Sequence, residues 1–243
     1  MWLIGAGTGY GRALSIYFLK RGFKVIISGR RESLLRELKQ QLVKSGIAKT
    51  GKVSYLVYDC SEPTDPSISE FFATHVDFLA AVLFCAGRAA ARVTDTPMLD
   101  LSETELMDTI DVNALGALRS VRAAQPYLEK GPSGVRQVYL FSSMAGWSAK
   151  VGWGDYSISK ALLNAIGRNL SQEFLERHKS NQTPLIKVLI VIASEAKTEM
   201  NQGSQISPNI ANPLIEHCLD FPELFVSGGA YFFNGELFES VLL

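Results

Sequence analysis

A tyrosine and a lysine four residues apart, Tyr156 and Lys160, are the side chains of this sequence whose types and spacing most directly suggest chemistry. On a helix such a pair shares one face. An ammonium beside a phenol favours the phenolate and lowers the pKa of the tyrosine toward the range of an acid–base catalyst. Ser143 ends a predicted strand, and its hydroxyl can donate to a carbonyl oxygen. The three predict a proton-transfer site, although this spacing alone is equally compatible with an ordinary helix start.

A glycine-rich turn lies between a predicted first strand, Trp2–Ile4, and a helical segment, Arg12–Lys20. Glycines permit a tight turn and let the backbone approach a pyrophosphate, whose charge then lies at the helix N-terminus. The position predicts a dinucleotide site, the alternative being a turn and nothing more. The residues of the turn, all but Ala6 candidates for cofactor binding, are Gly5, Ala6, Gly7, Thr8, Gly9, Tyr10 and Gly11.

Two arginines, Arg30 and Arg31, follow the second predicted strand about twenty residues later. A cofactor without a 2′-phosphate is usually held at this place by an acidic residue, and the first one here is Glu32. The guanidinium group is always charged and has a planar fork that suits phosphate. The pair therefore favours NADPH over NADH. The alternative is that both are solvated residues at the start of a helix.

The elements that must position these groups alternate along the chain. Strand-like apolar runs and amphipathic helical segments follow one another, which predicts an α/β fold: a doubly wound parallel sheet of about seven strands with helices on both faces. No repeat or linker divides the chain, so one domain over residues 1–243 is expected. Besides Trp2–Ile4, the predicted strands are Phe23–Ser28, Val53–Tyr58, Leu79–Cys85, Val135–Phe141, Ile186–Ile192 and Ala230–Phe233. Besides Arg12–Lys20, the predicted helices are Glu32–Lys44, one near Pro66, Glu103–Glu129, Tyr156–His178 and Asn209–Leu219.

Taken together, these motifs resemble the short-chain dehydrogenase/reductase family over nearly the whole chain, with a single Rossmann domain. Gly5, Gly9 and Gly11 match the glycines of its first turn. The resemblance implies an NADP-dependent oxidoreductase acting on CH–OH or carbonyl groups. The catalytic positions that it implies are Asn113, Ser143, Tyr156 and Lys160, and the further cofactor-binding positions are Asp59, Cys60, Ala86, Gly87 and Thr198, with Asn113, Tyr156 and Lys160 also touching the cofactor.

The same resemblance assigns roles within this set. Tyr156 is the expected general acid, Ser143 orients the carbonyl, and Asn113 holds a water that relays protons. Lys160 lowers the pKa of Tyr156 and bonds the nicotinamide ribose. Stretches at Gly152–Tyr156 and Thr198–Gln202 are similar to parts of the sepiapterin and benzil reductases.

The sequence also departs from the family pattern. Cys85 stands where an asparagine is usual, Ala193 and Ser194 replace a Pro-Gly pair, and Asn234-Gly235-Glu236 replaces a frequent Asp-Gly-Gly. The Pro-Gly replacement puts cofactor affinity at that loop in doubt. These changes leave two alternatives open: a cofactor-binding sensor or scaffold without turnover, and a biosynthetic dehydratase or epimerase on the same fold.

Composition limits the remaining possibilities. The 24 basic and 24 acidic side chains balance, which argues against nucleic acid as a partner. Three separated cysteines and isolated histidines predict neither disulfides nor a metal site. No apolar run approaches a membrane span, so a cytoplasmic protein without a membrane partner is expected. Trp147, Trp153 and Met200 are candidates for lining an apolar or aromatic pocket for a small carbonyl substrate. The resemblance further implies a homodimer or homotetramer.

Overall fold

The computed structural model describes residues 1–63, 66–89, 96–148, 151–181, 183–193, 195–233 and 238–241. Within these ranges eight strands form one sheet. The strands are β1 (Trp2–Ile4), β2 (Val25–Gly29), β3 (Val53–Val57), β4 (Ala81–Phe84), β5 (Arg136–Ser142), β6 (Ile186–Ile192), β7 (Ala230–Phe233) and β8 (Phe238–Val241). The α-helices are α1 (Gly9–Lys20), α2 (Glu32–Lys44), α3 (Pro66–His75), α4 (Glu103–Ile110), α5 (Gly116–Leu128), α6 (Gly154–Asn181) and α7 (Asn212–Asp220).

The strands lie in the order β3-β2-β1-β4-β5-β6-β7-β8. β1 to β7 are parallel, and β8 pairs antiparallel with β7 at the edge. The first six strands have the order of a doubly wound Rossmann sheet. Successive strands are added on one side of β1 up to β3, and on its other side from β4 onward. The prediction of a doubly wound parallel sheet of about seven strands is confirmed. β8 is an additional strand that the sequence did not predict.

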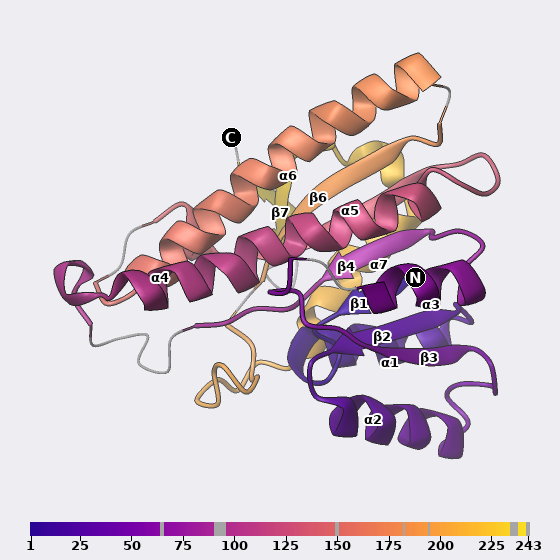
Figure 1. Ribbon diagram of the computed structural model, residues 1–243, viewed down its shortest axis with the longest axis horizontal. Helices are drawn as coiled ribbons and strands as arrows, with labels where there is room; N and C mark the ends of the chain where they lie inside the picture. Colours follow the sequence, from indigo (N-terminus) through magenta and orange to yellow (C-terminus); the bar gives the residue numbers. More distant parts are fainter. Residues whose placement is uncertain are drawn as a thin grey trace.

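Helices cover both faces of the sheet (Figure 1). α1, α2 and α7 bury their apolar side chains on one face, and α3, α5 and α6 do so on the other. Successive residues of β5 contribute to opposite layers, since Tyr139 joins the first cluster and Leu140 the second. Strands covered on both faces are apolar at most positions, which is why the central runs show no alternation. Full burial of a side chain such as Phe18 or Leu163 stabilises the fold by about 1.5–3 kcal/mol.

The predicted helix Glu103–Glu129 is interrupted. α4 and α5 are joined by a π-helical turn, Asp111–Leu115, and α4 and this turn pack against α6 (Figure 1). Ser102 begins α4 with a reciprocal cap: its Oγ accepts from the Glu105 amide at 3.2 Å and donates to Oε2 of the same residue at 2.8 Å. π-helical turns are frequent at functional sites, and this one contains Asn113.

Across the described ranges, no helix is both long and apolar enough to cross a membrane. Ser194 and the Asn234-Gly235-Glu236 segment, which the sequence singled out as departures from the family, lie outside the described residues.

Candidate active site

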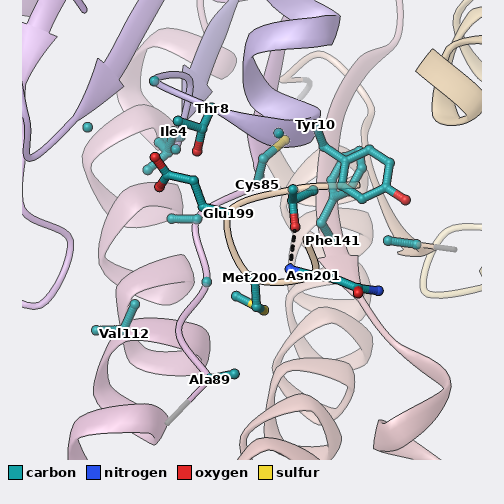
Figure 2. A pocket seen from close by; sticks show the side chains of 18 of the residues that line it. Ile4, Thr8, Tyr10, Cys85, Ala89, Val112, Phe141, Glu199, Met200 and Asn201 are labelled. Atoms are coloured by element: carbon teal, nitrogen blue, oxygen red, sulfur yellow. Dashed lines mark hydrogen bonds between the residues drawn. The ribbon is translucent and has the colours of Figure 1, made fainter. Parts of the chain in front are cut away.

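A cleft of about 680 Å³ lies at the carboxyl ends of β1, β2, β4, β5 and β6, where doubly wound sheets bind their ligands (Figure 2). Asn113, Asp59, Gly11 and Trp147, which the sequence also selected, are not among its lining residues, and Trp147 packs instead against the core at β6 and β7. The sequence-selected residues that line it are Gly5, Gly7, Thr8, Gly9, Tyr10, Arg30, Arg31, Cys60, Ala86, Gly87, Ser143, Trp153, Tyr156, Lys160, Thr198 and Met200.

The glycine turn is held against two neighbouring strands. The amides of Gly5 and Ala6 both donate to the carbonyl of Ser28 at 2.9 Å. Gly5 has φ of 82°, and a Cβ there would lie 2.6 Å from the backbone nitrogen of Ala86. A side chain at this position therefore meets backbone that cannot rotate away. Gly11 is similarly constrained, because a Cβ there would collide with the carbonyl of Gly5.

Gly5→Ala is expected to lower the free energy of unfolding by roughly 3 kcal/mol or more, because left-handed backbone strain of about 1 kcal/mol adds to the collision with Ala86. Gly22→Ala is the matched control: Gly22 has φ of 85°, but a Cβ there meets nothing within 4 Å. This control should cost only about 1 kcal/mol. Urea denaturation of both variants measures the difference. Equal losses would mean that the close approach at Ala86 carries no energetic weight.

Ser143 and Tyr156 meet at the cleft. Ser143 follows β5 in extended conformation, and its Oγ accepts from the amide of Ala145 at 3.2 Å. Tyr156 lies in the first turn of α6, and the Ser143 side chain is its hydrogen-bond partner. The indole of Trp153 meets the Tyr156 ring edge-on, with 5.7 Å between centroids. The sequence therefore brings a hydroxyl and a phenol together at the position where they were expected.

Lys160 is buried one helical turn further along α6, with 4% of its surface exposed. Its Nζ donates to the carbonyl of Phe141 at 2.8 Å and lies 5.5 Å from the ring centre of Tyr156. Burial lowers the pKa of Lys160 from 10.5 to about 8, and the nearby Cys85 thiol partly opposes this change. The ammonium form still predominates at neutral pH.

The sequence predicted that Lys160 lowers the pKa of Tyr156, but in this structure the pKa of Tyr156 is raised. Burial raises the pKa of Tyr156, and the opposing influence is the hydrogen bond from Ser143. The physical reason is that the phenol is largely enclosed, whereas the ammonium group of Lys160 is directed to the Phe141 carbonyl. Tyr156 is thus a neutral phenol at neutral pH.

Asn113 is fully buried, and its amide ties two segments together. Its Oδ1 accepts from the Arg88 amide at 2.6 Å, and its Nδ2 donates to the Arg88 carbonyl at 2.8 Å and to Ser159 Oγ at 2.9 Å. Both amide hydrogens are therefore used within the protein, so of the side chain only the second lone pair of Oδ1 remains for the predicted relay water. Ser159, which sequence reasoning did not select, connects this network to α6.

Asp59 and Cys60 follow β3 at the far end of the cleft. Asp59 Oδ1 accepts from the amide of Ser61 at 3.0 Å and from its hydroxyl at 2.7 Å, which closes a local turn. The Cys60 thiol is buried against the Val112 carbonyl at 3.8 Å. Cys60 lines the cleft and Asp59 does not.

The two arginines at the rim differ in their partners. Arg31 forms a two-pronged ion pair with Glu199, with Nη1–Oε1 at 3.1 Å and Nη2–Oε2 at 2.6 Å. Arg30 is exposed and lines the cleft, and the described residues give it no ion pair. The sequence predicted a phosphate ligand for both arginines but did not anticipate that Glu199 would contact one of them.

Tyr10 also contacts residues outside the glycine turn. Its ring packs on Phe141 with 5.4 Å between centroids (Figure 2). Its hydroxyl is hydrogen-bonded to the backbone of Ala196. Burial, the largest cause, raises its pKa. Tyr10 therefore connects the glycine turn to the segment after β6, where the Pro-Gly pair is missing.

The residues 195–201, which follow β6, contribute six side chains or backbone groups to the lining of the cleft. A Cβ on Gly9 would lie 3.1 Å from Cγ2 of Thr198, and the carboxylate of Glu199 lies beside Thr8 (Figure 2). Glu199 and Thr8 are far apart in sequence, and no local pattern marks their contact. Among the described residues, no group of three or more His, Cys, Asp or Glu side chains could hold a metal ion.

Comparison with known proteins agrees with this arrangement. The family model described as short chain dehydrogenase matches residues 1–208. The very-long-chain 3-oxoacyl-CoA reductase of Pyricularia oryzae is 25% identical over 84% of this chain, and the match spans 59% of that relative's own length. An uncharacterized oxidoreductase of Staphylococcus epidermidis is 27% identical over 82% of this chain and 79% of its own.

Solved structures show the same fold. A short chain dehydrogenase from Salmonella enterica serovar Typhi superimposes with a TM-score of 0.81 at 21% identity, covering 95% of this chain and 93% of its own. One from Shigella flexneri, complexed with NADP, gives 0.80 at 21% identity, covering 95% and 94%. From its match to the family model, this chain belongs to the short-chain dehydrogenase/reductase family of oxidoreductases.

Proposed function

We propose that this protein is an NADPH-dependent reductase that converts a ketone, diketone or aldehyde to an alcohol. The observation that carries the proposal is the hydrogen bond between Ser143 and Tyr156 in the wall of the cleft, with the buried ammonium of Lys160 behind the phenol. A neutral phenol, a hydroxyl donor and a fixed cation are the groups that carbonyl reduction requires of the protein.

The residues around the cleft fit a dinucleotide. At Gly5 there is no room for a side chain, so the turn is shaped by backbone alone. Thr8 precedes α1 without capping it through its side chain. The N–H groups of the first helical turn are therefore suited to a pyrophosphate. Arg30 and Arg31 at the rim suit a 2′-phosphate. The neighbour from Shigella flexneri complexed with NADP supports the same choice of cofactor.

When bound, the nicotinamide supplies the hydride. Ser143 holds the carbonyl oxygen by a hydrogen bond, and Tyr156 gives that oxygen its proton. The Tyr156 phenol, whose pKa burial raises further above neutrality, is protonated at neutral pH and can act as the acid. In this proposal the ammonium group of Lys160, which also donates to the Phe141 carbonyl, bonds the nicotinamide ribose. In this proposal Asn113 fixes Ser159 and the backbone at Arg88, and with its remaining lone pair holds the water that restores the proton.

The substrate we propose is a small carbonyl compound with apolar or aromatic substituents. Trp153 and Met200 line the cleft; Trp153 contacts Tyr156, and Met200 is 47% exposed. Two relatives have names that denote reductases of coenzyme A esters, one of them a 3-oxoacyl-CoA reductase. These names support the direction of reduction.

We expect the purified protein to oxidise NADPH in the presence of at least one member of a panel of diketones, quinones and aldehydes. NADPH absorbance, followed with and without each compound, measures this activity. Silence across the panel combined with tight NADPH binding would overturn the proposal and favour the nucleotide-binding sensor. Product analysis separates carbonyl reduction from dehydration or epimerisation, because only reduction consumes one NADPH for each alcohol formed.

A further inference from the structure

The ion pair between Arg31 and Glu199 joins two distant parts of the chain across the rim of the cleft. Arg31 is the residue before α2, and Glu199 lies in the segment after β6. Two parallel hydrogen bonds use both Nη groups of the guanidinium fork. A fork of this kind is the geometry with which arginine binds carboxylate or phosphate. Glu199 therefore occupies the arginine edge that an incoming phosphate would need.

The same carboxylate also faces the glycine turn. Figure 2 shows it beside Thr8, the residue that precedes α1. Thr8 and Arg31 act together on Glu199, since hydrogen bonds from both hold the pKa of Glu199 below its ordinary range, with Arg31 the larger cause. One negative charge thus lies between the two places that fit the anionic groups of a dinucleotide.

The pair is exposed enough to exchange. The side chains of Arg31 and Glu199 are 56% and 54% exposed, and ion pairs of this exposure are worth about 0–1 kcal/mol. A phosphate group of nearly two negative charges can therefore displace the carboxylate from Arg31. Displacing the carboxylate lowers the apparent affinity for the ligand. The reason is that a site that is free only part of the time binds more weakly, in proportion to that fraction.

We propose that Glu199 is a specificity-determining residue for the nucleotide, which competes with the 2′-phosphate for Arg31 and thereby reduces the preference for the phosphorylated cofactor. This inference rests on the proposed function, because it assumes that NADPH binds in the cleft. Arg30 retains a basal preference for the phosphate, since no ion pair holds it in the described part of the chain. Through its charge near Thr8, Glu199 also weakens the binding of both nucleotides.

Glu199→Gln is expected to tighten NADPH binding by about two- to fivefold and NADH binding by less, so that the ratio of the two affinities increases. Isothermal titration calorimetry with NADPH and with NADH measures both. In an Arg31→Met background the same substitution should no longer change that ratio, because the shared partner is gone. Glu216→Gln is the matched control: Glu216 pairs with Arg21 at 2.9 Å, away from the cleft, and its loss should change neither affinity.

An unchanged or weakened affinity for NADPH in Glu199→Gln would overturn the inference, as would an increased ratio that persists without Arg31. The two levels of the proposal fail differently. If the unaltered protein binds neither nucleotide, the proposed function fails. If it binds NADPH and Glu199→Gln binds equally well, only the role of Glu199 is wrong.

Discussion

Replacing Tyr156 by phenylalanine is expected to reduce NADPH-dependent carbonyl reduction by about a thousandfold while changing the Kd for NADPH by less than about twofold. General acids contribute about 10²–10⁴ to rate, and Ser143 cannot replace the phenol, because an aliphatic hydroxyl is a far weaker acid. The ring is retained, so its contact with Trp153 persists. What is lost is the proton and the hydrogen bond to Ser143.

The matched control for Tyr156→Phe is Tyr127→Phe. Tyr127 lies in α5, packs against Phe72 of α3 and does not line the cleft, so its replacement should leave turnover unchanged. Single-turnover kinetics at saturating NADPH, together with calorimetric binding, separate chemistry from affinity. Turnover above about a tenth of normal in Tyr156→Phe would show that the proton comes from elsewhere.

Lys160→Met is expected to abolish most activity and yet to make the protein more stable at pH 7. The folded-state pKa of Lys160 is about 8 and its ordinary value is 10.5. Below pH 8 both folded and unfolded chains carry the proton, and the buried charge costs the fold about 3 kcal/mol. Above pH 10.5 neither state carries it, and the cost is gone. Loss of the bond to the Phe141 carbonyl offsets about 1 kcal/mol, which leaves a gain of about 2 kcal/mol.

Urea denaturation of Lys160→Met and the unaltered protein between pH 7 and 10.5 measures this gain, which should shrink steadily above pH 8. Lys187→Met provides the control for activity, because Lys187 donates to the carbonyls of Pro222 and Phe225, outside the cleft. Its rate of NADPH oxidation should stay within about twofold of normal. A Lys160→Met protein that is less stable at pH 7, or whose advantage does not depend on pH, contradicts the burial argument.

The sequence predicted the strands and helices whose signals lie in neighbouring residues. The run Ile186–Ile192 and the segment Glu32–Lys44 have the predicted bounds, because continuous apolar residues and helical periodicity are properties of neighbouring positions. The helix Glu103–Glu129 was only partly right. The π-helical turn at Asp111–Leu115 accompanies the contacts of Asn113 with Arg88 and Ser159, and those partners are distant in sequence.

The candidate site shows the same division. Ser143, Tyr156 and Lys160 could be selected because strand end, helix start and spacing locate them. The ion pair of Arg31 with Glu199 could not be predicted from the sequence. The two residues follow β2 and β6, which lie four strands apart in the sheet, so their contact depends on the tertiary fold. The effect of Lys160 on Tyr156 was likewise misjudged, because burial and the Phe141 carbonyl are products of packing.

Because Gly5 lies so close to Ala86, the shape of the glycine turn and the choice of nucleotide depend on different residues. The floor beneath the proposed nucleotide site is made of backbone that cannot change without damage to the fold. The discrimination between nucleotides that we propose rests instead on exposed side chains at the rim, Arg30, Arg31 and Glu199. Substitutions on exposed positions usually alter stability by no more than about 0.5 kcal/mol. Cofactor preference in this chain can therefore be redesigned, or can drift, almost independently of the stability of the domain.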